Sequence, residues 1–450
     1  MKTGVTSTKH LASMSFRIDP SLHLSEGLRV REELSKSPYG LINISDTSDK
    51  IFYGNIFSRI FVKDKAHGRT YLAASDTVLA DIETGRYLSQ KQADKLKYLW
   101  LEKDWILVTC SGTLGNVTYT NSTFEDKIAT HDLIRIVPND NRILRGVVFA
   151  FLAGKYGYYQ ITQSQFGGVI KHINDKEVGR IAIPLFPEDF QVKIDKLVRE
   201  SARLREESTQ ALLNAKDQIE TLIPPLNVNN FGSVNYQTIL TNLGKRFEAS
   251  FHKSLGKELD TYIKEHFKWL PLSKLASVSR PDLFKRCYVD GGLMFLGGAD
   301  IFLATPQSNK FVSRTRTPNI STLILKEGDI LLPRSGTIGE VAIATSQHAQ
   351  KLASEDVIRI SASDPLYAGY LYAFLSSSIG KALIKRYIFG SVIQHVEPHQ
   401  LNHIPIPILD EGKMTKIAIL ANENKEKLGK AGELELTAIS LVEQEIEKWS

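Results

Sequence analysis

Two long stretches of the chain carry a narrow apolar stripe at helical spacing. In residues 189–223 the apolar side chains are separated by three, four and seven positions, and no Gly or Pro interrupts them before Pro224. Residues 411–450 repeat this pattern, although Gly429 and Gly432 weaken the middle of the predicted helix. About 33 residues rising 1.5 Å each would form a rod of roughly 50 Å. Such a narrow stripe is typical of a coiled-coil seam rather than of a helix on a globular core.

A mixture of short strands and helices is predicted before each of these stretches. In the first half, apolar runs predict strands at 105–110, 133–137 and 181–184 and a helix at 144–153. In the second half, they predict strands at 329–332, 357–360 and 404–407 and a helix at 366–383. Residues 166–173 and 389–396 are each expected to be a loop leading into a strand, with Gly at the turn. The predicted fold class is therefore α+β, with a mixed α/β body before each long helix.

The two halves of the chain match each other in one register. With a shift of 224 residues, Ser111–Val117 falls on Ser335–Val341 and Asp132–Ile136 falls on Asp356–Ile360. After one deleted residue the match continues at a shift of 223. A period this long is not that of a solenoid, whose units have roughly 20–50 residues. The chain thus carries two copies of a domain-sized unit, which suits a duplicated scaffold or a protein with a pseudo-twofold partner.

We expect five segments from this duplication. They are the bodies 1–187 and 246–410, the helices 188–224 and 411–450, and a polar linker with turn chemistry at 225–245. The twofold symmetry of the repeat would make the helix pair antiparallel, with one body at each end. The predicted helix-pair interface consists of Ile194, Leu197, Leu204, Ala211, Ile219, Leu222, Ile417, Leu420, Leu434 and Leu441.

Composition narrows the class of protein. The 450 residues include 56 basic and 50 acidic side chains, for a formal charge of +6, and the 24% charged and 42% hydrophobic residues are ordinary for a globular protein. Cys110 and Cys287 form no disulfide framework or zinc motif, which favours a reducing, cytoplasmic location. The first residues lack the apolar region of a secretory signal, and the longest apolar run, 146–154, is too short to cross a bilayer. The mild positive charge permits nucleic-acid binding without arguing for it.

Familiar catalytic and cofactor motifs are missing from the sequence. It has no phosphate-binding or dinucleotide-binding glycine motif, no Asn-Pro-Pro-aromatic motif, and no metalloprotease or serine-hydrolase signature. Asp410–Lys413 resembles a nuclease carboxylate–lysine cluster, but the helix dipole explains two acids where a helix begins. His172 and His395 occupy matching positions without further metal ligands nearby, which favours a structural or DNA-contacting role. We therefore expect no catalysis, no cofactor and no metal site.

Matching polar residues in the two halves supply the first candidate contacts to DNA. The Ser-Gly-Thr turns at 111–113 and 335–337 either offer backbone N–H groups to phosphate or are simply tight strand turns. Lys171 and Gln394 either reach a groove edge or lie in a solvated loop. Arg86 and Lys310 occupy equivalent basic positions and are candidates for phosphate contacts.

A basic loop in the second half supplies the other candidates. Arg314 and Arg316 have no clear copy in the first half, and two readers of different sequences should differ in such loops. Contact of Arg with guanine would be favoured there. The full set of candidate DNA-binding residues is Arg86, Ser111, Thr113, Lys171, His172, Lys310, Arg314, Arg316, Arg334, Ser335, Thr337, Gln394 and His395.

With these motifs in this order, given twice, the sequence resembles the specificity subunit of type I restriction–modification enzymes. The resemblance covers almost the whole chain, as two tandem target-recognition domains that are each followed by a long helix. It is carried by Val108–Gly115, Gly167-Gly168 and Ile181–Pro184 in the first copy and by Leu332–Gly339, Gly390-Ser391 and Ile404–Pro407 in the second. The family usually continues with Glu-Gln and an apolar helix, whereas residues 188–191 and 411–413 depart from that pattern, which leaves the subtype open.

The resemblance implies a reader of double-stranded DNA without catalysis of its own. Each domain would read one half of a bipartite, asymmetric site, and the helix pair would fix the spacer. Two modification (methyltransferase) subunits would supply S-adenosylmethionine and adenine methylation, and restriction subunits would supply ATP-driven translocation and cleavage. No membrane partner is implied.

Two alternatives stay open at this point. One is the specificity subunit of another restriction system, with a fused methyltransferase–nuclease as its partner. The neighbouring genes would distinguish this system from a type I system. The other is a duplicated scaffold that binds only protein. Sequence-specific, salt-dependent DNA binding in the presence of the partners would exclude the scaffold.

Overall fold

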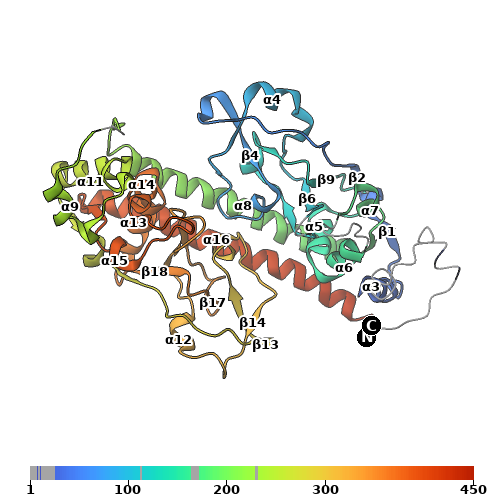
Figure 1. Cartoon of the computed structure of the whole chain (residues 1–450). Helices are drawn as coiled ribbons and strands as arrows, with labels where there is room; N and C mark the ends of the chain where they lie inside the picture. Colours follow the sequence, from blue (N-terminus) through green and yellow to red (C-terminus); the bar gives the residue numbers. More distant parts are fainter. Residues whose placement is uncertain are drawn as a thin grey trace. The chain divides into compact units, whose positions relative to one another are not determined.

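The computed structural model describes residues 26–449 apart from 112–113, 164–171 and 229–231, together with residues 8 and 11. The chain divides into two compact units, and the division falls within each of the two long helices. These helices are α8 (Glu188–Glu220), green in Figure 1, and α16 (Glu411–Glu447), red in Figure 1. Unit 1 consists of Met1–Glu206 and Lys430–Ser450, and unit 2 consists of Glu207–Gly429. Each unit therefore contains one mixed body and a part of both helices.

Unit 1 combines small sheets with short helices. Its strands are β1 (Leu41–Asn43), β2 (Ser48–Phe52), β3 (Phe61–Val62), β4 (Gly68–Leu72), β5 (Tyr87–Ser89), β6 (Ile106–Thr109), β7 (Val117–Tyr119), β8 (Ile128–Ala129), β9 (Leu133–Pro138) and β10 (Ala182–Pro184). Its helices besides the long ones are α3 (Glu26–Leu34), α4 (Gln90–Lys95), α5 (Arg145–Ala153), α6 (Lys155–Gln163) and α7 (Asp175–Gly179). The sheets have the orders β2-β9-β6-β7 and β3-β5-β4-β8, and β1 pairs with β10.

Unit 2 is built in the same way. Its strands are β11 (Trp269–Pro271), β12 (Ser277–Ser279), β13 (Tyr288–Leu296), β14 (Phe311–Val312), β15 (Ile330–Pro333), β16 (Ala342–Ile343), β17 (Leu352–Ala353), β18 (Val357–Ser361) and β19 (Pro405–Pro407). Its shorter helices are α9 (Tyr236–Thr241), α10 (Ala249–His252), α11 (Leu255–His266), α12 (Ile320–Leu323), α13 (Pro365–Ser376), α14 (Ser378–Arg386) and α15 (Pro398–Leu401). The sheets have the orders β12-β18-β15-β16 and β14-β13-β17, and β11 pairs with β19.

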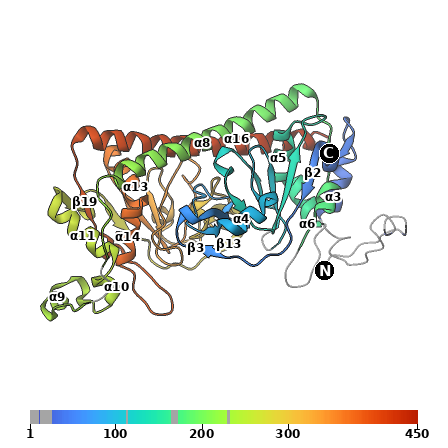
Figure 2. The same cartoon turned by 90° about the horizontal axis from the view of Figure 1, so that it is seen from above.

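The strand pairings of the two units confirm the predicted duplication. The central sheets use antiparallel pairs 224 residues apart, and the second sheets share one parallel pair with the same offset. The matched pairs are Leu107–Arg135 with Leu331–Arg359, and Tyr71–Ile128 with Phe295–Leu352. Figure 2 shows the same chain from a direction turned by 90°, with α8 and α16 seen along their length. The fold is thus α+β, with two tandem mixed bodies and two long helices.

Burial in each body follows the hydrophobic pattern. Every residue of β6 is buried, and residues 146–152 of α5 are all buried, as expected for a helix that is apolar on all sides. In unit 2, residues 369–376 of α13 are buried in the same way. Within the described part of the chain, no helix combines the length and the apolar character needed to cross a membrane.

Three elements differ from the sequence-based prediction. The single helix expected at 366–383 is two helices, because Ser377 separates them and its hydroxyl accepts a hydrogen bond from the Gly380 N–H (3.2 Å). The strand expected within 389–396 is reduced to isolated bridges from His395 to Ser335 and to Phe389. The expected linker contains the short helix α9, whose first turn is capped by Asn235. Residues 166–173, which are the counterpart of 389–396 in the first half, lie almost entirely outside the described residues.

Candidate functional site

Within unit 1, the starting part of α8 packs against the final part of α16. Ile194 and Val198 share a buried cluster with Ala438, Val442 and Ile446. The Ser201 hydroxyl, seven positions after Ile194, donates a hydrogen bond to the Ala431 carbonyl, seven positions before Ala438 (2.7 Å). The residue numbers of the contacts rise along α8 while they fall along α16, so the two helices are antiparallel in unit 1.

Within unit 2, a buried polar contact joins the remaining parts of the two helices. The Asn424 amide donates to the carbonyl and hydroxyl oxygens of Ser208 (2.9 and 2.8 Å), and the Ser208 hydroxyl donates to the Asn424 carbonyl (3.0 Å). Beside it, Lys427 forms an ion pair with Glu207 (2.7 Å). Ser208 and Asn424 lie in the seam for which the sequence analysis predicted apolar residues alone. The spacing of seven from Ile194 to Ser201 to Ser208 was the signal that could have revealed the two serines.

The predicted seam residues differ in how far they are buried. Those that are buried are Ile194, Leu204, Ala211, Ile219 and Ile417. Those that are half-buried against a core cluster are Leu197, Leu222, Leu420 and Leu441. Leu434 is half-buried and belongs to no core cluster among the described residues.

The Ser-Gly-Thr turns are fixed by a serine–aspartate contact that recurs in both units. The Ser111 hydroxyl donates to the Asp132 carboxylate (2.8 Å), and Ser335 donates to Asp356 in the same way. Ser111 also forms a bridge with His172, as Ser335 does with His395. Both serine hydroxyls are thus engaged within the protein. Thr337 is exposed, whereas Thr113 and Lys171 lie outside the described residues.

Arg334 lies in a network of charges rather than free on the surface. Its guanidinium binds Glu397 (2.8 Å) and Asp356 (3.3 Å), and Arg280 binds the second oxygen of Glu397 (3.1 Å). Burial by itself lowers the pKa of Arg334, but the two carboxylates outweigh it and leave that pKa raised. The equivalent positions in unit 1 hold the neutral Cys110 and Asn174. The Cys110 thiol is buried, and burial raises its pKa to about 12, so it stays protonated.

Three exposed basic candidates flank β14 in unit 2. Lys310 precedes β14, Arg314 and Arg316 follow it, and no side-chain ion pair engages them within the part of unit 2 that the structure describes. Arg86, the equivalent of Lys310, forms an ion pair with Asp76. Gln394 is exposed on a different loop. The segment 310–316 is thus the part of the candidate set with cationic groups available to a ligand.

A buried arginine in each unit was missed by the sequence analysis. Arg135 donates to the carbonyls of Leu133, Leu99, Ala129 and Thr130 (2.9–3.3 Å). Arg359 donates to the carbonyls of Val357, Leu323 and Ala353 (3.0–3.4 Å), all 224 positions after their counterparts. Burial lowers the pKa of both side chains to about 10. Each arginine ties the central sheet of its unit to neighbouring segments, which is a structural role.

A second arginine in each unit holds the loop that follows β2 or β12. Arg59 lies over the ring of Tyr71 (5.6 Å) and donates to the Thr130 hydroxyl (3.3 Å). Arg286 lies over Phe295 (5.1 Å) and donates to the Ser354 hydroxyl (3.4 Å), at the equivalent positions. The same loops carry the exposed side chains Ile56 (86% exposed) and Leu283 (82% exposed), which are also equivalent. Each loop therefore combines an exposed apolar side chain with an arginine that attaches the loop to the body.

The described residues contain no group of three or more His, Cys, Asp or Glu side chains that could hold a metal ion.

Comparisons with known proteins identify two segments of the chain. A family model described as the type I restriction modification DNA specificity domain matches residues 61–213 and 293–419. No curated protein matches the chain. Solved structures similar to it include a type I restriction–modification S subunit from M. genitalium, at 12% identity and a TM-score of 0.35, covering 92% of this chain and 96% of that one. Another is the HsdS subunit from Thermoanaerobacter tengcongensis, at 14% identity and a TM-score of 0.27, covering 92% and 96%.

A third similar structure comes from a study of complex assembly and conformational transition in the type I R-M system. It is 14% identical, has a TM-score of 0.29, and covers 91% of this chain and 96% of that one.

Proposed function

Because this chain belongs to the type I restriction modification DNA specificity domain family, matched in two tandem segments over more than half its length, we propose that it reads DNA sequence for a restriction–modification complex. Each body reads one half of a bipartite, asymmetric target on double-stranded DNA. The helix pair sets the spacer and docks two modification subunits, and restriction subunits join the same complex. The proposed segments are bodies 1–187 and 246–410, helices 188–224 and 411–450, and linker 225–245.

One observation supports modular reading above all. The two units share their internal framework, including the serine–aspartate contact and the buried arginine, but differ in exposed side chains. Arg314 and Arg316 of unit 2 occupy the positions of Gln90 and Gln92 in unit 1. The Gln92 amide binds the backbone at Ser58 and Ile60, whereas Arg314 and Arg316 are exposed. A common frame with different exposed groups is what two readers of different sequences require.

The complex of this chain with its modification subunits tests the proposal. Methylome sequencing of the host supplies the target, and filter binding then compares that duplex with a scrambled one over a salt series. We expect tight, target-specific binding that weakens steeply with salt, because phosphate contacts release counterions. Equal binding of both duplexes would contradict sequence reading, and binding of neither duplex would leave the scaffold alternative.

Exchange of the second body tests the modular division. Replacing residues 246–410 by those of a relative should change one half of the methylated motif and leave the other intact. A change in both halves, or in neither, contradicts separate reading by the two bodies. A methylation pattern that requires a fused methyltransferase–nuclease would instead favour the other restriction system.

The chain is also proposed to lack catalysis of its own. The purified chain should neither methylate nor cut DNA, and S-adenosylmethionine turnover by it alone would refute this.

A further inference from the structure

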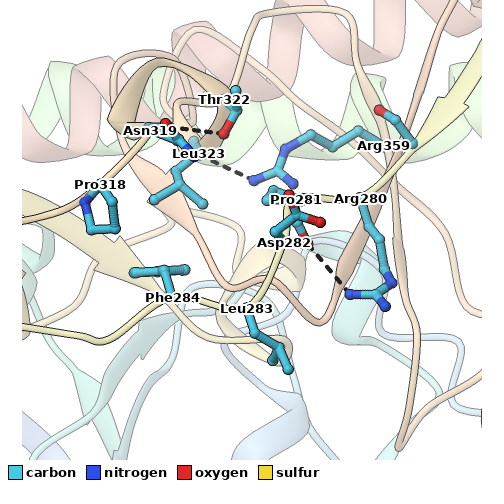
Figure 3. Close-up of a pocket in the computed structure, with 11 residues that line it drawn as sticks. Arg280, Pro281, Asp282, Leu283, Phe284, Pro318, Asn319, Thr322, Leu323 and Arg359 are labelled. Atoms are coloured by element: carbon cyan, nitrogen blue, oxygen red, sulfur yellow. Dashed lines mark hydrogen bonds between the residues drawn. The ribbon is translucent and has the colours of Figure 1, made fainter.

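Unit 2 contains a pocket of about 290 Å³ beside its buried arginine. The segments 279–284 and 318–323 form its walls, and Figure 3 shows the Arg359 side chain extending between them toward Leu323. Small-molecule sites occupy roughly 300–1,000 Å³, so this pocket suits one ring-sized group. The polar side chains of Asp282, Asn319 and Thr322 also line it.

The guanidinium of Arg359 is an unusual group to line a pocket. Arg359 is 6% exposed, and carbonyl oxygens are its hydrogen-bond partners. Its Nε is buried and has no partner within the described part of the chain. Arg359 takes part in no ion pair among the described residues, and the Asp329 carboxylate only partly offsets the effect of burial on its pKa. The pocket therefore presents a desolvated cationic plane to whatever enters.

Unit 1 places an aromatic ring of its own beside the corresponding arginine. Phe52 pairs with Arg135 across two strands, and its ring lies 5.9 Å from the guanidinium. The register partner of Arg359 is Ser279, which lacks a ring. Thr322 stands where unit 1 has Tyr98, directly before the leucine whose carbonyl accepts from the arginine. Both aromatic positions of unit 1 are thus small hydroxyl side chains in unit 2, where the pocket lies.

The chemistry of this space points to a flat heteroaromatic ring. Planar rings stack on a guanidinium, and nucleobases in particular use Arg planes for stacking. The amide of Asn319, the hydroxyl of Thr322 and the carboxylate of Asp282 can pair with the donor and acceptor groups at a base edge. The rim also carries the exposed Leu283, and the exposed Arg314 and Arg316 precede the 318–323 wall in sequence. An apolar tip on the rim and a basic segment that leads into one wall suit a nucleic-acid strand.

We propose that this pocket binds a single unstacked nucleobase of the half-site that unit 2 reads. This inference rests on the proposed DNA-reading function and adds to it a position at which sequence is read outside the helical stack. Because unit 1 carries the Phe52 ring beside its buried arginine, base capture is specific to the second half-site.

Filling the pocket tests the inference. Ser279→Phe restores the ring that unit 1 carries at this position, and Ser277→Phe places the same ring on the same strand outside the pocket lining. The assay uses the full chain with its modification subunits and target duplexes that carry 2-aminopurine at single positions of the second half-site. In the wild type, fluorescence should rise several-fold at one position besides the methylated base.

We expect Ser279→Phe to abolish that rise and to weaken target binding roughly tenfold, since stacking of one base contributes about this much. Binding to a scrambled duplex should stay within about twofold. Ser277→Phe should match the wild type in every readout. Thr322→Tyr, which fills the pocket from the other wall, replaces Ser279→Phe if circular dichroism shows that variant to be unfolded.

The outcomes separate this inference from the function on which it rests. If the wild type does not prefer its target duplex, the DNA-reading proposal fails. If the wild type prefers its target but the pocket-filling variants bind and report as the wild type does, only base capture is overturned. A loss of complex assembly with modification subunits, without DNA, would assign the pocket to a protein side chain and also overturn it.

Discussion

At the scale of single residues, the buried arginines show how a charge is kept inside each body. Arg135 is fully buried and is held by backbone carbonyls rather than by an acid. Replacing it by Met keeps much of the volume but leaves those carbonyls without a donor. We expect Arg135→Met to lower the free energy of unfolding by roughly 3 kcal/mol in urea titrations. The exposed Arg314→Met should change it by less than about 0.5 kcal/mol, and an equal loss in both variants would contradict the structural role.

A buried histidine makes the stability of unit 2 depend on pH. The His348 ring accepts from the Thr345 N–H (3.1 Å) and contacts the Ile301 carbonyl (3.0 Å), and burial lowers its pKa from 6.5 to about 4. The folded state then binds fewer protons than the unfolded state, so stability is lost as pH falls from 6.5 toward 4. The full effect is roughly 3 kcal/mol.

Urea unfolding at several pH values between 7 and about 4 measures this dependence. His348→Gln should flatten the slope relative to the wild type, whereas His67→Gln, at an exposed position, should keep it. The same slope in all three proteins would show that His348 does not titrate on unfolding.

At the scale of elements, polar residues within the apolar seam fix how the helices meet in unit 2. Asn424 and Ser208 exchange three hydrogen bonds, and such a buried polar contact disfavours other registers. Asn424→Ala should lower the free energy of unfolding by about 1–3 kcal/mol, because Ser208 is left buried without its partner. Asn214→Ala, on the exposed face of α8, is the control and should be nearly neutral. A neutral Asn424→Ala would count against a specified register.

Much of each element could be predicted because hydrophobic pattern and burial agree there. The helix starts at 188 and 411 follow directly from the end of the Pro strand, and β6, β9, β15 and β18 match the predicted apolar runs. Arg135 could not be assigned from pattern, because a charge at such a position usually faces solvent. Its partners are backbone carbonyls at Leu99, Ala129, Thr130 and Leu133, so only the fold reveals them. Arg334 is a candidate DNA-binding residue from the sequence, and only the fold shows that its side chain binds Glu397 and Asp356.

At the scale of the whole molecule, the duplication predicts the behaviour of a half-chain. Residues 1–225 contain one body and one long helix, but Leu212, Ala215 and Ile219 lose the α16 residues that cover them in unit 2. A second copy can cover this apolar face in a closed twofold dimer. Light scattering at tens of micromolar should show a dimer, and with modification subunits it should direct methylation to a palindrome. A folded half-chain that stays strictly monomeric would rule out the helix-pair model.

Because the unit boundaries fall inside the helices, they determine the order in which the two units can be completed during translation. Unit 2 is one continuous segment, whereas unit 1 needs Lys430–Ser450 as well as its first 206 residues. Ala438, Val442 and Ile446 belong to the buried cluster of the first body, and the Trp449 ring lies 5.6 Å from that of Tyr39. The ribosome has therefore translated the whole of unit 2 before it supplies the residues that complete unit 1. The unit that begins first in the sequence is the last to be completed.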